Sequence, residues 1–142
     1  MRCLSRDGSA FIFGCFHNIG LINRICQIKG YQIINEIVWA VRNSRPNATA
    51  MKLQHSHHNI LWVGKGMGNY RFNYRACKEC DYPSDYFAGR GKQLRTVWDI
   101  PAAPHENKPY RHPSPKPLAV CQRMLDVAGK PGGLLLDMFS GS

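Results

Sequence analysis

Three short apolar runs, each bounded by glycine or by polar turn residues, constrain the fold more than any other feature of the sequence. They are SAFIFG at residues 9–14, YQIINEIVWAV at 31–41 and HNILWVGKG at 58–66. Isoleucine, valine and aromatic residues dominate all three, which is typical of β-strands. The sequence therefore predicts a β-sheet at the centre of the fold, with the third strand at residues 59–63.

Two segments with helical periodicity alternate with these runs. In HNIGLINRICQIKG, residues 17–30, the apolar residues recur every three or four positions, and Gly30 supplies a stop. In PLAVCQRMLDVAGKPGG, residues 117–133, a proline opens the helix, and the predicted apolar face consists of Leu118, Cys121, Leu125 and Ala128. A closing strand, GLLLDMF, is predicted at residues 133–139. This order of strands and helices predicts an α/β fold.

The connections between these elements are polar and basic. A loop rich in Asn, Ser, Pro and Arg separates the second and third strands, which favours an antiparallel pair at a sheet edge. Residues 64–95 contain Gly, Asn, Tyr, Arg and Lys with little periodicity, so they are predicted to form an irregular insertion.

The net positive charge is the most informative feature of the composition. The 142 residues contain 19 Lys and Arg against 9 Asp and Glu, a net charge of +10. Such a balance indicates a polyanionic partner, although a merely solvated basic surface would have the same composition. The sequence has no apolar run long enough for a membrane span and no signal-peptide pattern, so we expect a cytoplasmic protein without a membrane partner. We expect its six cysteines to be reduced.

The last 31 residues, HPSPKPLAVCQRMLDVAGKPGGLLLDMFSGS, resemble the joined cofactor motifs of S-adenosylmethionine-dependent DNA amino-methyltransferases. The resemblance is to the adenine-N6/cytosine-N4 type in which the cofactor half comes last. The segments DGSAFIFG, NEIVWAVRNSRPNA, HNILWVGKG and GKQLRTVWDIP follow the order used by the same family. The resemblance implies a partial Rossmann-like methyltransferase sheet with a recognition insertion, and methyl transfer to adenine or cytosine in double-stranded DNA, as in restriction–modification.

The resemblance also implies a cofactor site for S-adenosylmethionine. A glycine turn after a strand lets backbone N–H groups approach a ligand at the carboxyl edge of an open α/β sheet, which supports this independently. Asp137, Phe139 and Gly141 would line the adenosine and methionine side, and Ser114 and Lys116 would meet the amino-acid end. Phe13 and Gly14 would border the same pocket from the neighbouring strand.

The family's catalytic tetrapeptide, Asp-Pro-Pro-Tyr or a similar sequence, is not present in this chain. In the family it precedes the strand that SAFIFG resembles, so we expect the chain to be a truncated middle piece that is inactive alone. No residue is therefore predicted to be catalytic. The strand leading to the tetrapeptide would lie between SAFIFG and LLLDMF, and its loss would leave an unpaired sheet edge through which copies could associate.

The resemblance divides the chain into three parts. Residues 1–63 would be the target-base side of the catalytic α/β domain, 64–97 the target-recognition insertion, and 98–142 the truncated cofactor-binding part. In the insertion, basic residues alternate with Tyr and Phe, a pattern that suits phosphate contact and base stacking. The predicted nucleic-acid-binding residues are Arg71, Arg75, Lys78, Arg90, Lys92 and Arg95. A solvated basic loop over packed aromatic residues is an equal alternative at this point.

The alternative function is a non-catalytic, basic nucleic-acid-binding module, with or without zinc support. Cys77 and Cys80 form one CxxC pair, and only His55, His57 or His58 could complete a set of four zinc ligands. With no second CxxC in the sequence, we predict no metal site.

Overall fold

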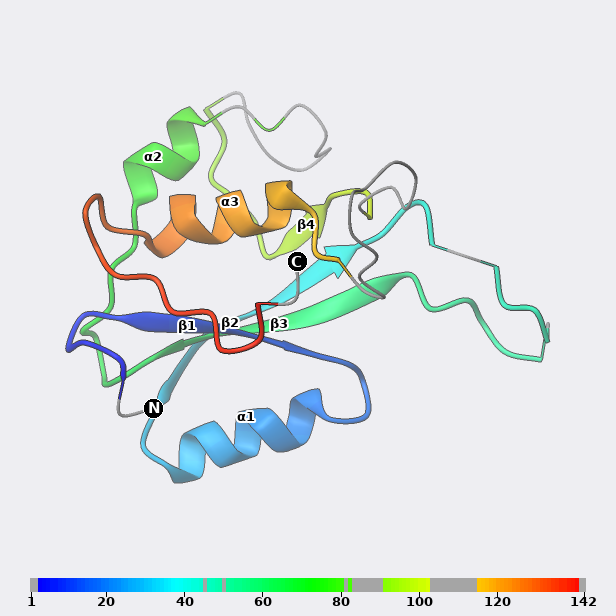
Figure 1. Cartoon of the computed structure of the whole chain (residues 1–142), viewed down its shortest axis with the longest axis horizontal. Helices are drawn as coiled ribbons and strands as arrows, with labels where there is room; N and C mark the ends of the chain where they lie inside the picture. Colours follow the sequence, from blue (N-terminus) through cyan, green and yellow to red (C-terminus); the bar gives the residue numbers. More distant parts are fainter. Residues whose placement is uncertain are drawn as a thin grey trace.

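The computed structural model describes residues 3–44, 46–49, 51–80, 82, 91–102 and 115–140. It contains a four-stranded sheet with the strand order β1-β3-β2-β4 (Figure 1). The strands are β1 (Ser9–Gly14), β2 (Gln32–Ala40), β3 (His57–Gly64) and β4 (Val97–Asp99). β1 and β2 both run antiparallel to β3, and β4 runs parallel to β2. The three predicted strands in the first half of the chain and the antiparallel pairing of β2 with β3 are therefore confirmed. The predicted position of this pair at a sheet edge was wrong, because β1 and β4 flank it on its two sides.

Helices cover both faces of this sheet. α1 (Ile19–Ile28) lies on one face, and α2 (Tyr74–Glu79) and α3 (Leu118–Ala128) lie on the other (Figure 1). α1 ends at Ile28, and the predicted stop residue Gly30 follows it with a φ of 74°. The N–H of Gly30 donates to the carbonyl of Gln27 at 2.9 Å, and that of Tyr31 to the carbonyl of Cys26 at 3.0 Å. This pair of bonds is a Schellman motif, which needs a residue that tolerates a left-handed backbone.

β3 is buried on both sides because the two helical layers sandwich it. Ile60 and Trp62 belong to the cluster that includes residues of α3, whereas Leu61 and Val63 pack in the cluster that includes Cys26 of α1. Ile60, Leu61 and Val63 are all 0% exposed. A strand covered on both faces is apolar at successive positions rather than alternately, which explains the unbroken run ILWV.

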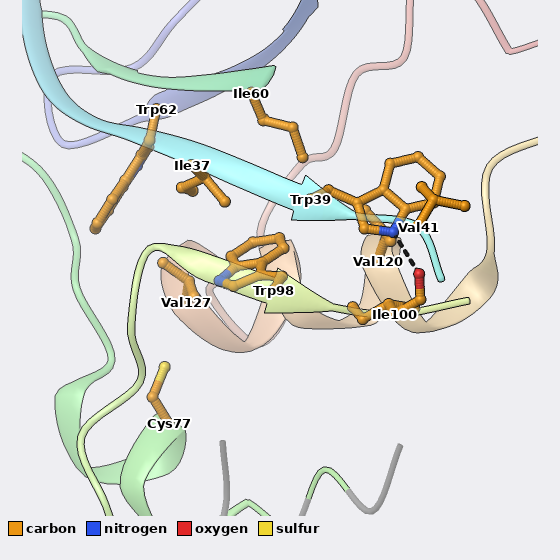
Figure 2. Close-up of a cluster of buried hydrophobic side chains, with 10 residues drawn as sticks. All are labelled: Ile37, Trp39, Val41, Ile60, Trp62, Cys77, Trp98, Ile100, Val120 and Val127. Atoms are coloured by element: carbon orange, nitrogen blue, oxygen red, sulfur yellow. Dashed lines mark hydrogen bonds between the residues drawn. The ribbon is translucent and has the colours of Figure 1, made fainter. Parts of the chain in front are cut away.

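The core on the α3 side is built around tryptophans (Figure 2). Trp39 of β2 donates its indole N–H to the carbonyl of Ile100 at 2.7 Å, and Trp98 of β4 donates to the carbonyl of Arg95 at 2.9 Å. Both indole N–H groups are therefore satisfied although the rings are buried. The bond from Trp39 ties β2 to the chain just beyond β4.

Two expectations about helices were wrong. Residues 64–95 are not irregular throughout, because they contain α2, whose six residues are too few for periodicity to reveal. α3 has the predicted extent but a different buried face, made of Val120, Arg123 and Val127, while Leu118 is 81% exposed. The helix buries this other face because Arg123 packs against the rings of Tyr82 and Trp98 in the interior. The spacing of apolar residues in the sequence does not reveal a buried arginine.

The predicted closing strand at residues 133–139 was also wrong. Residues 133–137 form no strand, and Leu134, Leu135 and Leu136 are 106%, 76% and 64% exposed. A strand needs a neighbour to pair its backbone N–H and C=O groups. β1 pairs with β3 on one side, and no strand among the described residues lies on its other side to receive this segment.

Two further observations concern the predicted organisation. β4 lies across the predicted boundary between residues 97 and 98, and the three-part division itself stays a prediction. Within the described residues, none of the helices has the length and apolar character needed to cross a membrane.

Candidate functional site

The carboxyl ends of β1 and β2 lie at the same edge of the sheet because both strands run antiparallel to β3. Gly14 ends β1, and a Cβ atom built on it would lie 2.7 Å from Cδ1 of Ile19. The side-chain oxygen of Asn18 accepts the N–H of Cys15 at 2.8 Å, which fixes the turn into α1. Gly14 thus allows α1 to start close against the strand, at the edge where open α/β sheets bind ligands.

Lys116 and Phe13, predicted from opposite ends of the sequence, lie together at this edge. Nζ of Lys116 is 5.5 Å from the centroid of the Phe13 ring, a cation–π arrangement. Beside them, the ring of His58 stacks on Trp39 with centroids 4.9 Å apart. Burial, and then the charge of Lys116, lowers the pKa of His58, so this imidazole is held neutral next to a cation. This edge of the sheet therefore carries the ammonium group of Lys116, which packs on the aromatic ring of Phe13.

Asp137 and Phe139 belong to the exposed segment after α3. Oδ1 of Asp137 accepts the N–H of Phe139 at 2.9 Å, and the Phe139 ring is 87% exposed. Burial, followed by the charge of Asp137, raises the pKa of Cys121, a residue on which Lys116 also acts with the opposite sign. Ser114 and Gly141 lie outside the described residues.

Basic residues of the insertion are arranged around α2. Arg75 and Lys78 are exposed, whereas Cys77 on the opposite side of α2 is 2% exposed and packs in the core. Positions 75 and 78 are three residues apart and share one helical face, so α2 presents two cations to solvent. Lys92 and Arg95 are exposed on the stretch that leads into β4, and Arg90 lies outside the described residues.

The aromatic residues of the insertion are only partly available for stacking. Tyr70 and Phe72 pack against Trp62, with ring centroids 5.5 Å and 5.7 Å away. Phe72 and Tyr74 remain 41% and 44% exposed. Phe72 therefore has one side packed against Trp62 and another side exposed to solvent, and base stacking by the aromatic residues of the insertion stays a prediction. Tyr86 and Phe87 lie outside the described residues.

A polar network that the sequence did not reveal joins the insertion to α3. The guanidinium carbon of Arg123 lies 4.1 Å from the ring centroid of Tyr82 and 5.4 Å from that of Trp98. The hydroxyl of Tyr82 donates to Oδ2 of Asp126 at 3.0 Å. Arg123 is 1% exposed, so this arginine stabilises the packing of the insertion against α3 and is not available to contact DNA. No local pattern marks a buried arginine, because its partners come from distant segments.

The same network changes the titration of two side chains. Burial, and next the charge of Asp126, raises the pKa of Cys77 to about 11. Burial and the hydrogen bond to Asp126 raise the pKa of the Tyr82 hydroxyl. Both groups are therefore neutral at neutral pH, and Cys77 is a structural thiol rather than a nucleophile.

The cysteines and histidines are not arranged as a metal centre in the described part of the chain. No group of three or more His, Cys, Asp or Glu side chains there is placed to hold an ion. All six cysteines are free thiols. His55 lies instead beside His57, with ring centroids 4.9 Å apart, at the entry to β3.

Comparison with known proteins identifies the family. A family model described as DNA methylase, of the N6/N4 type, matches residues 1–142. The chain belongs to the DNA methylase family. The family predicted from the HPSPKP and LLLDMFSGS segments is therefore confirmed over the full length of this DNA methylase chain.

Two curated relatives of this DNA methylase chain are Type II methyltransferases. The chain is 30% identical to M2.DpnII of Streptococcus pneumoniae, with 98% of the chain and 50% of the relative covered. It is 29% identical to M2.LlaDCHI of Lactococcus lactis subsp. cremoris, with the same coverage. The chain thus spans about half the length of the curated relatives it matches.

Solved structures support the fold of this DNA methylase chain. A crystal structure of an M1.HpyAVI–SAM complex aligns with a TM-score of 0.62 at 19% identity, covering 89% of this chain and 55% of that one. A second M1.HpyAVI structure aligns with a TM-score of 0.56 at 17% identity, covering 89% and 52%. At such identity the likeness concerns the fold alone, and it confirms the predicted α/β class with a partial methyltransferase sheet.

Proposed function

We propose that this chain is part of a DNA amino-methyltransferase and holds S-adenosylmethionine at the carboxyl edge of β1. The observation that carries the proposal is the meeting of Lys116 and Phe13 at that edge, in a chain of the DNA methylase family. When bound, the cofactor supplies a methyl group on a sulfonium, which an amino nitrogen of adenine or cytosine would receive.

The residues at the edge fit the chemical groups of this cofactor. Lys116 would bind the amino-acid carboxylate, because an ammonium and a carboxylate attract strongly at a partly buried edge. Asp137 would accept hydrogen bonds from the adenosine side, and the exposed ring of Phe139 would pack on that side. Ser114, Gly141, Phe13 and Gly14 complete the proposed cofactor set.

DNA is the proposed partner of the insertion. The support is the net charge of +10 and the exposed pair Arg75 and Lys78 on α2. Arg71, Lys92, Arg95 and Arg90 complete the proposed set of phosphate contacts. Exposed Tyr74 and Phe72 beside these cations suit contact with bases or sugars. DNA as substrate, together with six free thiols, supports a cytoplasmic location.

A thermal-shift experiment tests the cofactor part. S-adenosylhomocysteine should raise the melting temperature of the 142-residue chain, by mass action on the folded state. Lys116→Ala and Asp137→Ala should remove the rise, while Lys29→Ala beyond α1 should keep it. A chain that melts lower in a chelator and ignores S-adenosylhomocysteine would instead be the non-catalytic, zinc-supported binding module.

Two further measurements concern activity and assembly. The chain alone should transfer no labelled methyl group to DNA, because it contains no Asp-Pro-Pro-Tyr tetrapeptide; detectable transfer would contradict this proposal. β1 pairs only with β3 in the described sheet, and an unpaired edge favours association between copies. Sedimentation should therefore show concentration-dependent oligomers, and a stable monomer at all concentrations would overturn the assembly proposal.

A further inference from the structure

The carboxyl end of α3 is capped by a residue of the insertion. The last carbonyls of a helix have no donors within the helix. Nδ2 of Asn73 donates to the carbonyls of Asp126 and Gly129 at 3.1 Å and 2.7 Å, and the Asn73 N–H donates to the carbonyl of Val127 at 2.9 Å. The thiol of Cys77 adds a contact to the Asp126 carbonyl at 3.5 Å. Residues preceding and within α2 therefore hold the end of α3 in place.

The cap is tied directly to a proposed phosphate contact. Nη1 of Arg71 donates to Oδ1 of Asn73 at 3.3 Å. Because the Asn73 oxygen faces a cation, its amide nitrogen is turned toward the α3 carbonyls. A guanidinium has five N–H donors, so Arg71 can bind a phosphate and keep its bond to Asn73. One chain of hydrogen bonds thus runs from the half-buried Arg71 through Asn73 to the end of α3.

The end of α3 determines where the cofactor segment begins. Gly129, whose carbonyl Asn73 holds, opens a turn in which the Gly133 N–H donates to the Lys130 carbonyl at 2.8 Å. Residues 133–140 leave this turn without any strand pairing and carry Asp137 and Phe139. The capped turn therefore fixes the position of residue 133, where the exposed segment 133–140 begins.

We propose that Asn73 is a positioning residue that couples DNA binding at Arg71 to cofactor binding at residues 133–140. The inference rests on the proposed function. A phosphate on Arg71 would hold Asn73 against α3 and order the turn, so that a cofactor binding second would meet a segment that is already partly ordered. The coupling is reciprocal: each ligand tightens the other by the same factor.

A matched pair of arginine variants tests the coupling. Arg71→Ala and Arg75→Ala each remove one cation from the insertion, but of these two arginines only Arg71 has a hydrogen bond to Asn73 among the described residues. For the wild type and both variants, the Kd of S-adenosylhomocysteine is measured with and without a short DNA duplex. In the wild type and in Arg75→Ala, we expect DNA to lower the Kd of S-adenosylhomocysteine by about fivefold or more. In Arg71→Ala, we expect the Kd to be nearly the same with and without DNA.

Hydrogen exchange of residues 126–136 supplies a readout that needs no cofactor. DNA should slow exchange there in the wild type and in Arg75→Ala, but not in Arg71→Ala. Asn73→Asp, which keeps an oxygen for Arg71 but loses the amide donor, should abolish the slowing while DNA still binds. Equal ratios and equal exchange in all proteins would overturn the inference alone. A chain that binds neither ligand would overturn the proposed function along with it.

Discussion

At the scale of single residues, the most consequential side chain is a charge inside the protein. Arg123 is 1% exposed on α3 and lies between the rings of Tyr82 and Trp98. Removing a guanidinium from water is costly unless aromatic faces or hydrogen bonds replace its hydration. Its partners come from the insertion and from β4, so Arg123 joins three segments that are distant in sequence.

We expect Arg123→Ala to lower the free energy of unfolding by about 3 kcal/mol, since it leaves a buried site empty and removes the cation that packs on the Tyr82 ring. Urea denaturation followed by tryptophan fluorescence measures the loss, and Trp98 lies next to the site. Arg24→Ala, which removes an exposed arginine from α1, is the matched control and should change stability by less than about 0.5 kcal/mol. Equal losses in both variants would mean that Arg123 contributes only its charge.

The titration of Cys77 predicts how stability depends on alkaline pH. The folded pKa is about 11, above the ordinary value of 9.0, so from pH 9 upward the unfolded chain loses the thiol proton more readily than the folded chain does. This stabilisation is complete below pH 9 and disappears between pH 9 and 11; Tyr82, whose pKa is also raised, adds in the same direction.

We therefore expect the melting temperature to fall between pH 8 and pH 10 and to fall by at least about 2 °C less in Cys77→Ala. Differential scanning fluorimetry at the two pH values measures both changes. Cys3→Ala, which removes an exposed thiol, should leave the pH dependence of the wild type intact. A Cys77→Ala protein with the full alkaline loss would contradict the role of this thiol.

At the scale of elements, α1 and the turn after it show that the position of a glycine decides whether its replacement by alanine raises or lowers stability. Gly30 forms the Schellman motif with a φ of 74°, a conformation in which a Cβ is strained. Gly20 lies in the first turn of α1, and a Cβ built on it would meet nothing within 4 Å. Two glycines ten positions apart, one inside α1 and one just after it, therefore predict opposite effects of alanine.

Gly30→Ala should destabilise the chain by about 1 kcal/mol, because alanine resists the left-handed backbone. Gly20→Ala should stabilise it by up to about 1 kcal/mol, because alanine favours the helix more than glycine does. Chemical denaturation of the two variants in parallel measures both effects. Destabilisation by Gly20→Ala would show that α1 packs more tightly at its start than the structure describes.

Elements whose evidence is local could be predicted from the sequence, and elements that depend on distant partners could not. β1, β2 and β3 were found because their side chains alone form apolar runs, and α1 because its period and Gly30 are local signals. The run 134–136 is equally apolar, yet it forms no strand, since pairing depends on a neighbour that its own residues do not encode. The buried face of α3 depended in the same way on Tyr82 and Trp98.

The candidate site divides along the same line. Lys116 and Phe13 were predicted from the resemblance and do lie together. Asn73 was missed, because an asparagine before a short helix carries no signal for a cap on a helix more than fifty residues away, at Asp126 and Gly129. Chemistry that depends on residue type is visible in a sequence, whereas chemistry that depends on backbone groups of a distant element is not.

At the scale of the whole molecule, a net charge of +10 attracts any polyanion, so the question is where on the surface it acts. Arg75 and Lys78 are exposed on α2, and Arg24 and Lys29 are exposed on or just after α1. The two helices lie on opposite faces of the sheet (Figure 1). The two pairs carry the same charge, so they distinguish a binding surface from general basicity.

DNA affinity falls with salt because each neutralised phosphate releases counterions, with a slope of about −0.9 per contact in a plot of log K against log salt. Removing Arg75 and Lys78 together, as alanines, should make the slope shallower by about 1.8. Removing Arg24 and Lys29 together should leave it unchanged, although the net charge falls equally. Fluorescence anisotropy across a salt series measures both slopes. Equal changes in the two double variants would show that attraction comes from overall charge, and DNA would then have no preferred face on this chain.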